Sequence, residues 1–370
     1  MAKVQCHCNQ LTRPARRRQV CAHASALQQL SSPSPQLLGV VVALAALAIA
    51  VKRVLDRPSR TYDADDPNVG RAYDDWTREG ILEYYWGDHI HLGYYTDAER
   101  AAGYKRKDFK QAKRDFVDEM LRFSSAQRPK RILDVGCGVG GTSRILAAKF
   151  SEASVTGITL SPEQAARATN LAKEQGINNC TFKVVDALNM TFEEESFDLV
   201  WACESGEHMP DKEKYVKEML RMLAPGGHIA IATWCQRDLQ PGQQFTEKEK
   251  GQLQFLYDEW AHPFFISKEE YGRILEASGK AQQVHLEDWT PQTVPTWRHS
   301  NWVGVWDPWI VVFKGPIIWY KTIREIIMIE RMHRAFSQGL MEYGMIRAQK
   351  PQGQSSSDRS EAGKQTPQYA

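Results

Sequence analysis

The stretch Arg131-Ile-Leu-Asp-Val-Gly-Cys-Gly-Val-Gly-Gly-Thr142 decides the fold of this chain. Its apolar run, residues 132–135, has the length and composition of a buried strand. The glycines behind the run permit a tight turn, and the sequence from Thr142 onward (TSRILAAKF) is typical of a helix. A strand, glycine turn and helix in this order present free backbone N–H groups to a ligand, as in the dinucleotide fingerprint G-x-G-x-x-G. We therefore expect a nucleotide-type ligand at this turn.

The chain beyond the glycine turn alternates between predicted strands and predicted helices. Ser161-Pro162 has the form of a helix start, with serine as N-cap and proline in the first turn. The alternation predicts an α/β fold with a doubly wound, mostly parallel sheet. The strands are expected at residues 155–158, 182–185, 197–202 and 228–233. Ligands of such sheets bind at the carboxyl ends of the strands, here residues 134–138, 159–161, 186–187 and 204–208.

The acidic residues at these strand ends argue against a nicotinamide cofactor. An NAD site places an Asp or Glu about 20 residues beyond the glycines, at the end of the second strand. In this chain Thr159-Leu160-Ser161 occupies that place. The acids instead precede the glycines, at Asp134, and end the third strand, at Asp186. A nicotinamide oxidoreductase would share the fold, but this arrangement disfavours it.

Charge and cysteine content exclude several classes of protein. Residues 1–55 carry seven of the 47 basic side chains and no acid, so the remainder has 40 basic against 45 acidic side chains. A mildly acidic body lacks the basic patch of a nucleic-acid binder, and no protein partner is indicated either. The seven Cys are scattered, and the four in the body show no metal-ligand spacing. We expect reduced thiols and no metal site.

Two segments precede the α/β domain, which we place at residues 69–350. Residues 1–35 are basic and free of acid, the composition of an organelle transit peptide. Residues 37–51 are 15 consecutive apolar residues closed by Lys52-Arg53, whereas a full membrane span needs about 20. We interpret residues 37–55 as a membrane anchor or as the apolar core of a targeting segment. The third interpretation is that residues 37–55 form a buried helix in the core of a soluble protein.

Two stretches of the domain are rich in aromatic residues. Residues 84–95 (YYWGDHIHLGYY) are poor helix material and predict a lid or pocket wall. Residues 290–343 interrupt the alternation before a last strand at 345–348, and five of the chain's 11 Trp lie between residues 297 and 319. Trp beside Lys and Arg on an apolar stretch is an interfacial pattern. It predicts an aromatic, membrane-facing lid; an ordinary lid over the substrate is the alternative. Residues 351–370 are polar and predicted to be disordered.

Four ordered motifs carry a resemblance to a known class of enzyme. LDVGCG, VDA, SFDLV and L-x-PGG resemble the motifs of class I S-adenosylmethionine-dependent methyltransferases. The resemblance implies that Asp134 and the glycine turn line the methionine end of the cofactor and that Asp186 and Ala187 meet its adenine. The usual ribose-binding acid is missing at Thr159. Methyltransferases with a T-L-S-x-x-Q segment are similar, and there the glutamine, here Gln164, binds the ribose.

The full set of cofactor-binding residues that the resemblance implies is Asp134, Gly136, Cys137, Gly138, Thr159, Leu160, Ser161, Gln164, Asp186, Ala187 and Glu204. The sulfonium of this cofactor is cationic, so acids and aromatic faces suit it. The candidates for that contact are Asp88, Glu204 and the tyrosines Tyr84, Tyr85, Tyr94 and Tyr95.

A closer resemblance concerns the methyl acceptor. The segments YDDWTREGILEYYWGDHIHLGYY, GITLSPEQ, ESGEHMPDK, TWCQRDL and FSQGLMEYGMIRAQK resemble the tocopherol and plastoquinone methyltransferases over roughly residues 62–350. The resemblance implies C-methylation of a prenylated benzoquinol with a phytyl or solanesyl tail, or alternatively methylation of gamma-tocopherol. An amine or sterol methyltransferase is less favoured. The resemblance to the tocopherol and plastoquinone methyltransferases also implies that the enzyme is located at a plastid membrane, either the envelope or the thylakoid. It implies further that the acceptor is delivered from that membrane.

The chemistry of such an acceptor calls for a base. A phenol has a pKa of about 10, so methylating the carbon beside its hydroxyl is helped by a group that takes the proton. His208 follows the fourth strand end and is the favoured base, because histidine titrates near neutral pH. Glu204 and Glu207 either orient it or act in its place, and His89 and His91 are further candidates. The alternative is that Glu204 and His208 only shape the turn.

Overall fold

The computed structural model describes residues 34–59, 62 and 68–352, and the chain divides into two compact units at Arg57 and Pro58. The predicted leader, apart from its last two residues, and the predicted disordered tail, apart from its first two, lie outside the described residues. The first unit contains helix α2 (Pro35–Leu55), which covers the predicted apolar segment. Ser34 caps this helix through its side-chain oxygen, which accepts a hydrogen bond from Leu37 N at 3.3 Å. By length and composition α2 could cross a membrane, a property that it shares with signal sequences.

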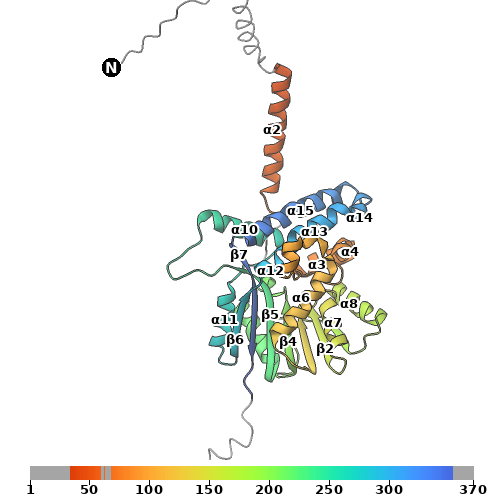
Figure 1. Ribbon diagram of the computed structural model, residues 1–370, viewed down its shortest axis with the longest axis vertical. Coiled ribbons are helices and arrows are strands. Elements are labelled where there is room, and N and C mark those ends of the chain that lie inside the picture. The colour runs from red at the N-terminus through yellow and green to blue at the C-terminus, as the bar shows by residue number, and fades with distance from the viewer. Residues whose placement is uncertain (1–33, 60–61, 63–67, 353–370) are drawn as a thin grey trace, which may run out of the picture. The chain divides into compact units, whose positions relative to one another are not determined.

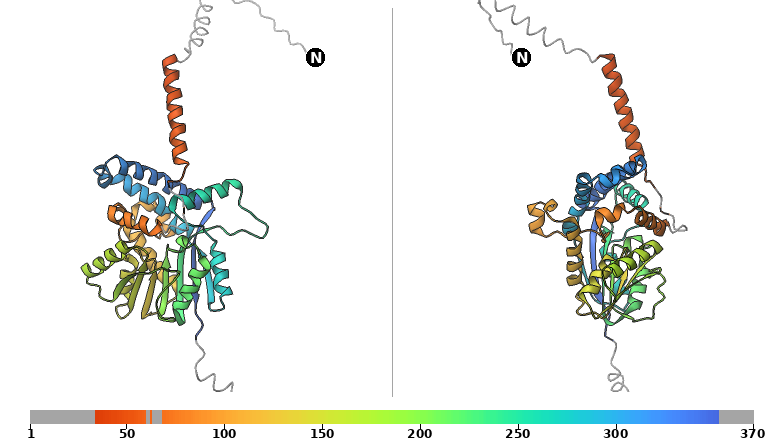
Figure 2. Two further views of the ribbon diagram at one scale, coloured as in Figure 1. Left: turned by 180° about the vertical axis from the view of Figure 1, so that it is seen from behind. Right: turned by 90° about the vertical axis from the view of Figure 1, so that its right-hand side faces the viewer.

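The second unit is built on one seven-stranded sheet, drawn in Figures 1 and 2. The strand order is β3-β2-β1-β4-β5-β7-β6; the first five strands are parallel, and β7 runs antiparallel to both β5 and β6. The strands are β1 (Arg131–Val135), β2 (Ser154–Thr159), β3 (Cys180–Val184), β4 (Phe197–Cys203), β5 (Leu223–Gln236), β6 (Gln282–Asp288) and β7 (Met341–Gln349). The predicted doubly wound, mostly parallel sheet is confirmed.

Two apolar clusters cover the two faces of the sheet, because successive strand residues point to opposite sides. Ile132 and Trp201 belong to one cluster, which includes Phe116 and Met120 of a helix before the sheet. Leu133 and Val200 belong to the other, which holds the helices that follow β4 and β5. Helices therefore bury both sides of the parallel strands and leave the carboxyl ends of the strands accessible to a ligand.

Two helices begin within one residue of the starts that the sequence predicts, α7 at Gly141 and α8 at Pro162. Ser161 caps α8 by accepting a hydrogen bond from Gln164 N at 3.0 Å. The connecting helices are α6 (Phe109–Ser124), α7 (Gly141–Lys149), α8 (Pro162–Glu174), α9 (Lys212–Met222), α10 (Glu247–Trp260) and α11 (Lys268–Ala277). Short helices also occur at α5 (Asp97–Ala102), η1 (Tyr104–Arg106) and η2 (Gly206–His208).

The region before the sheet differs from the prediction. Two helices lie here, α3 (Asn68–Glu79) and α4 (Ile81–Trp86), and they are separated by Gly80, which has a φ of +69°. Tyr84, Tyr85 and Trp86 are therefore helical, contrary to the expectation for residues 84–95. The reason is tertiary, since the hydroxyl of Tyr84 donates to Asp307 Oδ2 at 2.6 Å and that of Tyr85 donates to the Asp307 carbonyl at 2.6 Å.

The aromatic C-terminal region, residues 290–343, is almost entirely helical. It contains α12 (Thr290–Thr293), α13 (Pro295–Trp306), α14 (Trp309–Val312) and α15 (Pro316–Ser337). These helices gather at one end of the sheet, on the side where α3 and α4 lie (Figures 1 and 2). The ring of Trp297 packs on Trp234 of β5 with centroids 5.2 Å apart, which places α13 at the carboxyl end of that strand.

Candidate active site

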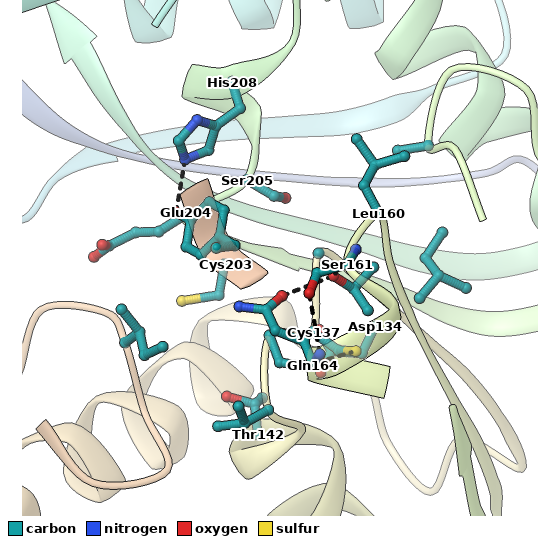
Figure 3. A pocket seen from close by; sticks show the side chains of 18 of the residues that line it. Asp134, Cys137, Thr142, Leu160, Ser161, Gln164, Cys203, Glu204, Ser205 and His208 are labelled. Atoms are coloured by element: carbon teal, nitrogen blue, oxygen red, sulfur yellow. Dashed lines mark hydrogen bonds between the residues drawn. The ribbon is translucent and has the colours of Figure 1, made fainter. Parts of the chain in front are cut away.

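A cavity opens at the carboxyl ends of β1, β2 and β4, under helix α3 and the segment 88–91. Most of the predicted site residues meet in its wall (Figure 3), where Gln164 and Ser161 lie near the glycine turn and Glu204 and His208 stand apart from them. Those brought together are Asp134, Gly136, Cys137, Gly138, Thr159, Leu160, Ser161, Gln164, Ala187, Glu204, His208 and His89.

The glycine turn leaves room for a ligand. Gly138 lines the cavity with a φ of +55°, and no atom lies within 4 Å of the point that a Cβ would occupy there. A side chain at this position would therefore project into open space that the backbone now borders. The turn runs into helix α7, whose first backbone N–H groups have no partner within the helix. This is the geometry expected for a bound nucleoside.

Asp134 is buried at the end of β1 and still lines the cavity. Its Oδ2 accepts a hydrogen bond from Ser143 Oγ at 2.6 Å. Burial raises the pKa of this carboxyl to about 6, so the group is ionised at neutral pH. A carboxylate in this position suits the cationic end of S-adenosylmethionine.

The segment between β2 and α8 is ordered by its own side chains. Thr159 Oγ1 donates to Gln164 Oε1 at 2.8 Å, and Ser161 N donates to Thr159 Oγ1 at 3.2 Å. Because its Oε1 is occupied in this way, Gln164 has its amide N–H groups left for a ligand in the cavity. Ser161 Oγ donates to Asp74 of α3, so the helix above the cavity is tied to this segment.

Two groups of predicted cofactor contacts are not brought to the cavity wall. The carboxylate of Asp186 closes the turn after β3, where it accepts from Leu188 N at 2.8 Å and from Asn189 Nδ2 at 2.7 Å. Ala187 lines the cavity in its place. The tyrosines Tyr84, Tyr85, Tyr94 and Tyr95 also lie outside the wall. Tyr84 and Tyr85 bind Asp307, and the hydroxyl of Tyr95 lies 2.8 Å from His299 Nδ1.

Glu204 occupies an unusual position after β4. Its φ of +49° is in the left-handed region, which a residue with a side chain adopts at a cost of about 1–3 kcal/mol. Its Oε1 accepts hydrogen bonds from Leu92 N and from the hydroxyl of Tyr343, both at 2.7 Å. Burial and the neighbouring Glu207 carboxylate raise the pKa of Glu204 above its ordinary value. Such a carboxyl is a stronger base than an exposed one.

His208 lies in the cavity as a neutral imidazole. Its Nε2 is 3.0 Å from the hydroxyl of Tyr73, and its ring lies 4.4 Å from the ring of His262. Burial, and to a smaller extent the Lys212 ammonium, lowers the pKa of His208 to about 3. The expectation that this histidine titrates near neutral pH is therefore wrong, because the folded chain removes its solvent. It remains able to accept or donate a hydrogen bond.

His89 and Asp88 lie on the segment that covers the glycine turn. His89 Nδ1 is 3.2 Å from His91 Nε2, and burial lowers the pKa of His89 well below its ordinary value. Asp88 accepts a hydrogen bond from Arg144 Nη2 at 2.7 Å. Arg144 Nη1 also donates to the Val139 carbonyl at 2.6 Å, so one guanidinium joins the glycine turn to the covering segment.

Three residues of the site have no role in the sequence analysis: Tyr73, Asp74 and Tyr343. Tyr73 and Asp74 stand in the segment YDDW that carries the family resemblance, which was a usable signal. Tyr343 comes from β7 and reaches Glu204 across 139 residues of sequence, and nothing local marks it.

Within residues 34–59, 62 and 68–352 no cluster of three His, Cys, Asp or Glu could hold a metal ion. Cys137, Cys180, Cys203 and Cys235 are buried free thiols.

A family model described as "Methyltransferase domain" matches residues 127–279. The chain is 42% identical over 320 residues to 2-methyl-6-phytyl-1,4-hydroquinone methyltransferase of Synechocystis sp., covering 85% of this chain and 97% of that protein. It is 36% identical over 293 residues to the chloroplastic tocopherol O-methyltransferase of Arabidopsis thaliana, covering 74% and 82%.

A solved structure supports the fold. The geranyl diphosphate C-methyltransferase of Streptomyces coelicolor, in complex with S-adenosyl-L-homocysteine, superimposes with a TM-score of 0.59 at 20% identity, over 76% of this chain and 96% of that one. The sheet, the glycine turn and the cavity define an S-adenosylmethionine-dependent methyltransferase. Within that class, the chain belongs to the family of 2-methyl-6-phytyl-1,4-hydroquinone and tocopherol methyltransferases.

Proposed function

We propose that this enzyme methylates a ring carbon of a prenylated 1,4-benzoquinol, with 2-methyl-6-phytyl-1,4-benzoquinol as the preferred acceptor and a solanesyl analogue as a second. The observation that carries the proposal is the 42% identity to the hydroquinone methyltransferase over nearly the whole of that protein. The cavity supports this proposal. One part of its wall is formed by the residues expected to bind the cofactor, and another part carries acid and imidazole side chains that can serve the acceptor. Gamma-tocopherol is the second candidate, favoured by the 36% identity to tocopherol O-methyltransferase.

The chain's own residues account for the binding of both reactants. S-adenosylmethionine, when bound, supplies an electrophilic methyl group. Asp134 and Gln164 would hold its charged and ribose groups, and Gly138 gives it room. On the acceptor side, Tyr73 and His208 form a neutral hydrogen-bonded pair that suits a phenolic hydroxyl.

Two different protons move in this reaction. The phenolic proton is taken up before methyl transfer and is returned to the oxygen when the ring becomes aromatic again, and the proton of the methylated carbon is the one released overall. We assign the uptake of the phenolic proton and its return to Glu204, because its raised pKa makes it the stronger base of the two groups at the end of β4. His208 then orients the hydroxyl through a hydrogen bond, and the backbone N–H of Leu92 holds the Glu204 carboxylate in place. His89, which also lines the cavity, is the remaining candidate.

The acceptor can be tested directly with the purified chain. Labelled S-adenosylmethionine is incubated with 2-methyl-6-phytyl-1,4-benzoquinol, with its solanesyl analogue and with gamma-tocopherol in separate reactions. The proposal predicts label in the two benzoquinols and the highest kcat/KM with the phytyl compound. Label in gamma-tocopherol alone would establish the second candidate. Label in none of the three would overturn the assignment.

Two substitutions test the acceptor-side pair. Tyr73→Phe keeps the ring but removes the hydroxyl that binds His208, and we expect kcat to fall about 10-fold. His208→Ala removes the pair and should lower kcat about 100-fold, with KM for S-adenosylmethionine unchanged. His285→Ala is the matched control, since this exposed histidine of β6 pairs with Glu287 and lies outside the cavity wall. Full activity in His208→Ala would remove the assignment.

The cellular location is also a proposal. The tocopherol O-methyltransferase of Arabidopsis thaliana is chloroplastic, and α2 is apolar enough to span a bilayer. We place the enzyme at a plastid membrane, with residues 1–35 as a transit peptide and α2 as a retained anchor. Mass spectrometry of the mature chain from plastid membranes washed with alkaline carbonate decides this. A mature chain that begins after residue 55, or that leaves the membrane in the wash, contradicts it.

A further inference from the structure

Several large apolar side chains are exposed on the C-terminal helices of the second unit. Trp306, at the end of α13, is 68% exposed, and Trp309 and Phe313 around α14 are 62% and 82% exposed. On α15, Ile317 and Ile323 are 73% and 60% exposed. We call these five side chains the tryptophan face. Large apolar side chains with more than half of their surface exposed rarely follow one another so closely in a soluble monomer, which indicates that the face has a partner.

The composition around the face matches the interfacial zone of a bilayer. Residues 302–323 contain a single acid, Asp307, and two bases, Lys314 and Lys321. Asp307 accepts a hydrogen bond from Tyr84, so its charge is held against α4. Trp, with an apolar ring and a polar N–H, together with Lys is the combination that settles at lipid headgroups.

The tryptophan face carries few polar groups. Of its five side chains only Trp306 and Trp309 have one, the indole N–H. Beside the face, the indole N–H of Trp319 is already used, since Nε1 donates to two backbone carbonyls of α14 at 3.1 and 3.0 Å. Trp309 and Phe313 stack on each other with planes 23° apart. A protein partner is normally recognised by hydrogen bonds as well as by area, at about one hydrogen bond per 100–200 Å². A surface with so few polar groups suits hydrocarbon instead.

The face is connected to the cavity by helices α3 and α4. Lys314 Nζ donates to the Glu79 carbonyl at 2.7 Å, and Lys321 Nζ pairs with the Glu79 carboxylate at 2.7 Å. Six residues earlier on the same helix, Tyr73 lies in the cavity wall against His208. The helix that closes the cavity is thus fixed at its C-terminal end to the helices that carry the face.

We propose that the tryptophan face contacts the bilayer surface, independently of α2, and that the prenyl tail of the acceptor enters the enzyme from the membrane on this side. The inference rests on the proposed function, because a long prenyl tail dissolves in the bilayer and only its quinol head has to reach the cavity. The face lets the tail stay in hydrocarbon while the head is methylated.

The test uses the full chain in vesicles of phosphatidylcholine with some anionic lipid. The face variant carries Trp306→Gln, Trp309→Gln, Phe313→Ser and Ile317→Gln, all at exposed positions outside the cavity wall. We expect its kcat/KM to fall about 10-fold for a phytyl benzoquinol embedded in the vesicles. The kcat/KM for a soluble methylhydroquinone without a tail should stay within about two-fold, because the cavity is intact. Val184→Gln, an exposed apolar residue of β3, is the control and should change neither value.

A physical measurement accompanies the kinetics. In vesicles that contain dibrominated phosphatidylcholine, the tryptophan fluorescence of the unmodified chain should be quenched, and Trp306→Phe/Trp309→Phe should lose most of that quenching. Every variant keeps α2, so a loss cannot come from a missing anchor. Unchanged quenching in that variant overturns the proposal.

The kinetic outcomes separate the competing explanations. Equal loss with both acceptors would mean that the face supports the fold, and no loss with either would mean that the tail enters elsewhere; both overturn the proposal. A dimer that dissociates in the face variant, without any change in quenching, would assign the face to a second copy of the chain. If the unmodified chain methylates neither acceptor, the proposed function fails, while the quenching still reports on the face.

Discussion

Two carboxyl groups and one ammonium group are buried together after β4. The Thr233 hydroxyl donates to Glu207 Oε2 at 2.8 Å, and Lys212 Nζ donates to the carbonyls of Gly206 and Glu207 at 2.7 and 3.0 Å. Burial lowers the pKa of Lys212 to about 7 and raises the pKa of Glu204. The shared burial therefore brings weakly ionised groups, rather than a permanent ion pair, to the acceptor side of the cavity.

Glu204→Gln should separate the effect of burying this charge on stability from the role of the carboxylate in catalysis. Because the pKa of Glu204 is raised on folding, its contribution to stability is present below the ordinary carboxyl pKa and is lost as the pH rises through the folded pKa. Glutamine never ionises, so the variant should have a higher Tm than the unmodified chain at pH 9, and this difference should shrink as the pH falls to 5. Its kcat should fall about 100-fold. Exposed Glu193→Gln should change neither; a variant destabilised at pH 9 would contradict the argument.

Asp134 gives a second prediction with a defined pH window. Its pKa of about 6 means that the carboxylate is lost as the pH falls below 6. We expect the affinity for S-adenosylmethionine to decrease from pH 7 to pH 5 in the unmodified chain. Asp134→Asn should bind S-adenosylmethionine about 10-fold or more weakly at pH 7, with no change over this range, since charge-assisted bonds to the cofactor are lost. Calorimetric titration of the cofactor in the absence of acceptor checks this, and a persistent pH dependence of the Kd in Asp134→Asn would contradict it.

At the scale of elements, the segment 87–95 is held directly against the glycine turn. The guanidinium of Arg144 in α7 binds Asp88 of the segment and the Val139 carbonyl of the turn. Gly141 makes this contact possible, because a Cβ at this position would lie 2.1 Å from the Asp88 carbonyl oxygen. The element that binds the cofactor and the element that covers it are therefore packed at backbone distance.

Gly141→Ala is predicted to push these two elements apart. A backbone carbonyl cannot yield as a flexible side chain does, so we expect a loss of about 1–3 kcal/mol in the free energy of unfolding and a raised KM for S-adenosylmethionine. Gly251→Ala is the matched control, because Gly251 lies inside helix α10 with nothing within 4 Å. That variant should gain up to about 1 kcal/mol. Denaturant unfolding compares the two, and equal stabilities would refute the packing argument.

At the scale of the second unit, a buried ion pair joins its distant segments. Arg324 of α15 donates to Glu259 of α10 through Nη2 at 2.6 Å and through Nε at 2.9 Å. Ser59, at the start of the unit, donates to the same carboxylate through its N–H at 2.6 Å and its hydroxyl at 3.0 Å. The side chains of Arg324 and Glu259 are only 7% and 6% exposed. This pair fixes the C-terminal helices to the rest of the unit.

Removing one partner of this pair should be far more costly than removing both. Arg324→Met leaves a buried carboxylate without its cation and should destabilise the unit by about 3–5 kcal/mol. The double variant Arg324→Met/Glu259→Leu should recover most of that loss. Arg334→Met, which breaks an exposed pair with Glu330, should cost about 1 kcal/mol or less. Thermal unfolding of the three variants decides, and a double variant as unstable as Arg324→Met would contradict this account.

Most of the architecture followed from local patterns. Mostly apolar runs at residues 132–135, 155–158 and 197–202 located β1, β2 and β4, and the Ser161-Pro162 cap located α8, because periodicity and capping depend on near neighbours. The order of Asp134, the glycines and Thr159 was enough to choose the class of cofactor. Local propensity failed to predict the helix at Tyr84 and Tyr85. A contact of Tyr85 with Asp307, 222 residues away, stabilises the helical conformation there.

The sequence by itself determined the sheet, the glycine turn and the family of this enzyme. Only the tertiary structure decided which acids and tyrosines face the cavity. Asp186 accepts a hydrogen bond within the turn after β3 instead of lining the cavity, and Tyr343 of β7 binds Glu204. Burial keeps His208 neutral. The physical reason is that strands and turns are specified by adjacent residues. Burial, and with it every pKa in the site, is set by groups that meet only when the chain has folded.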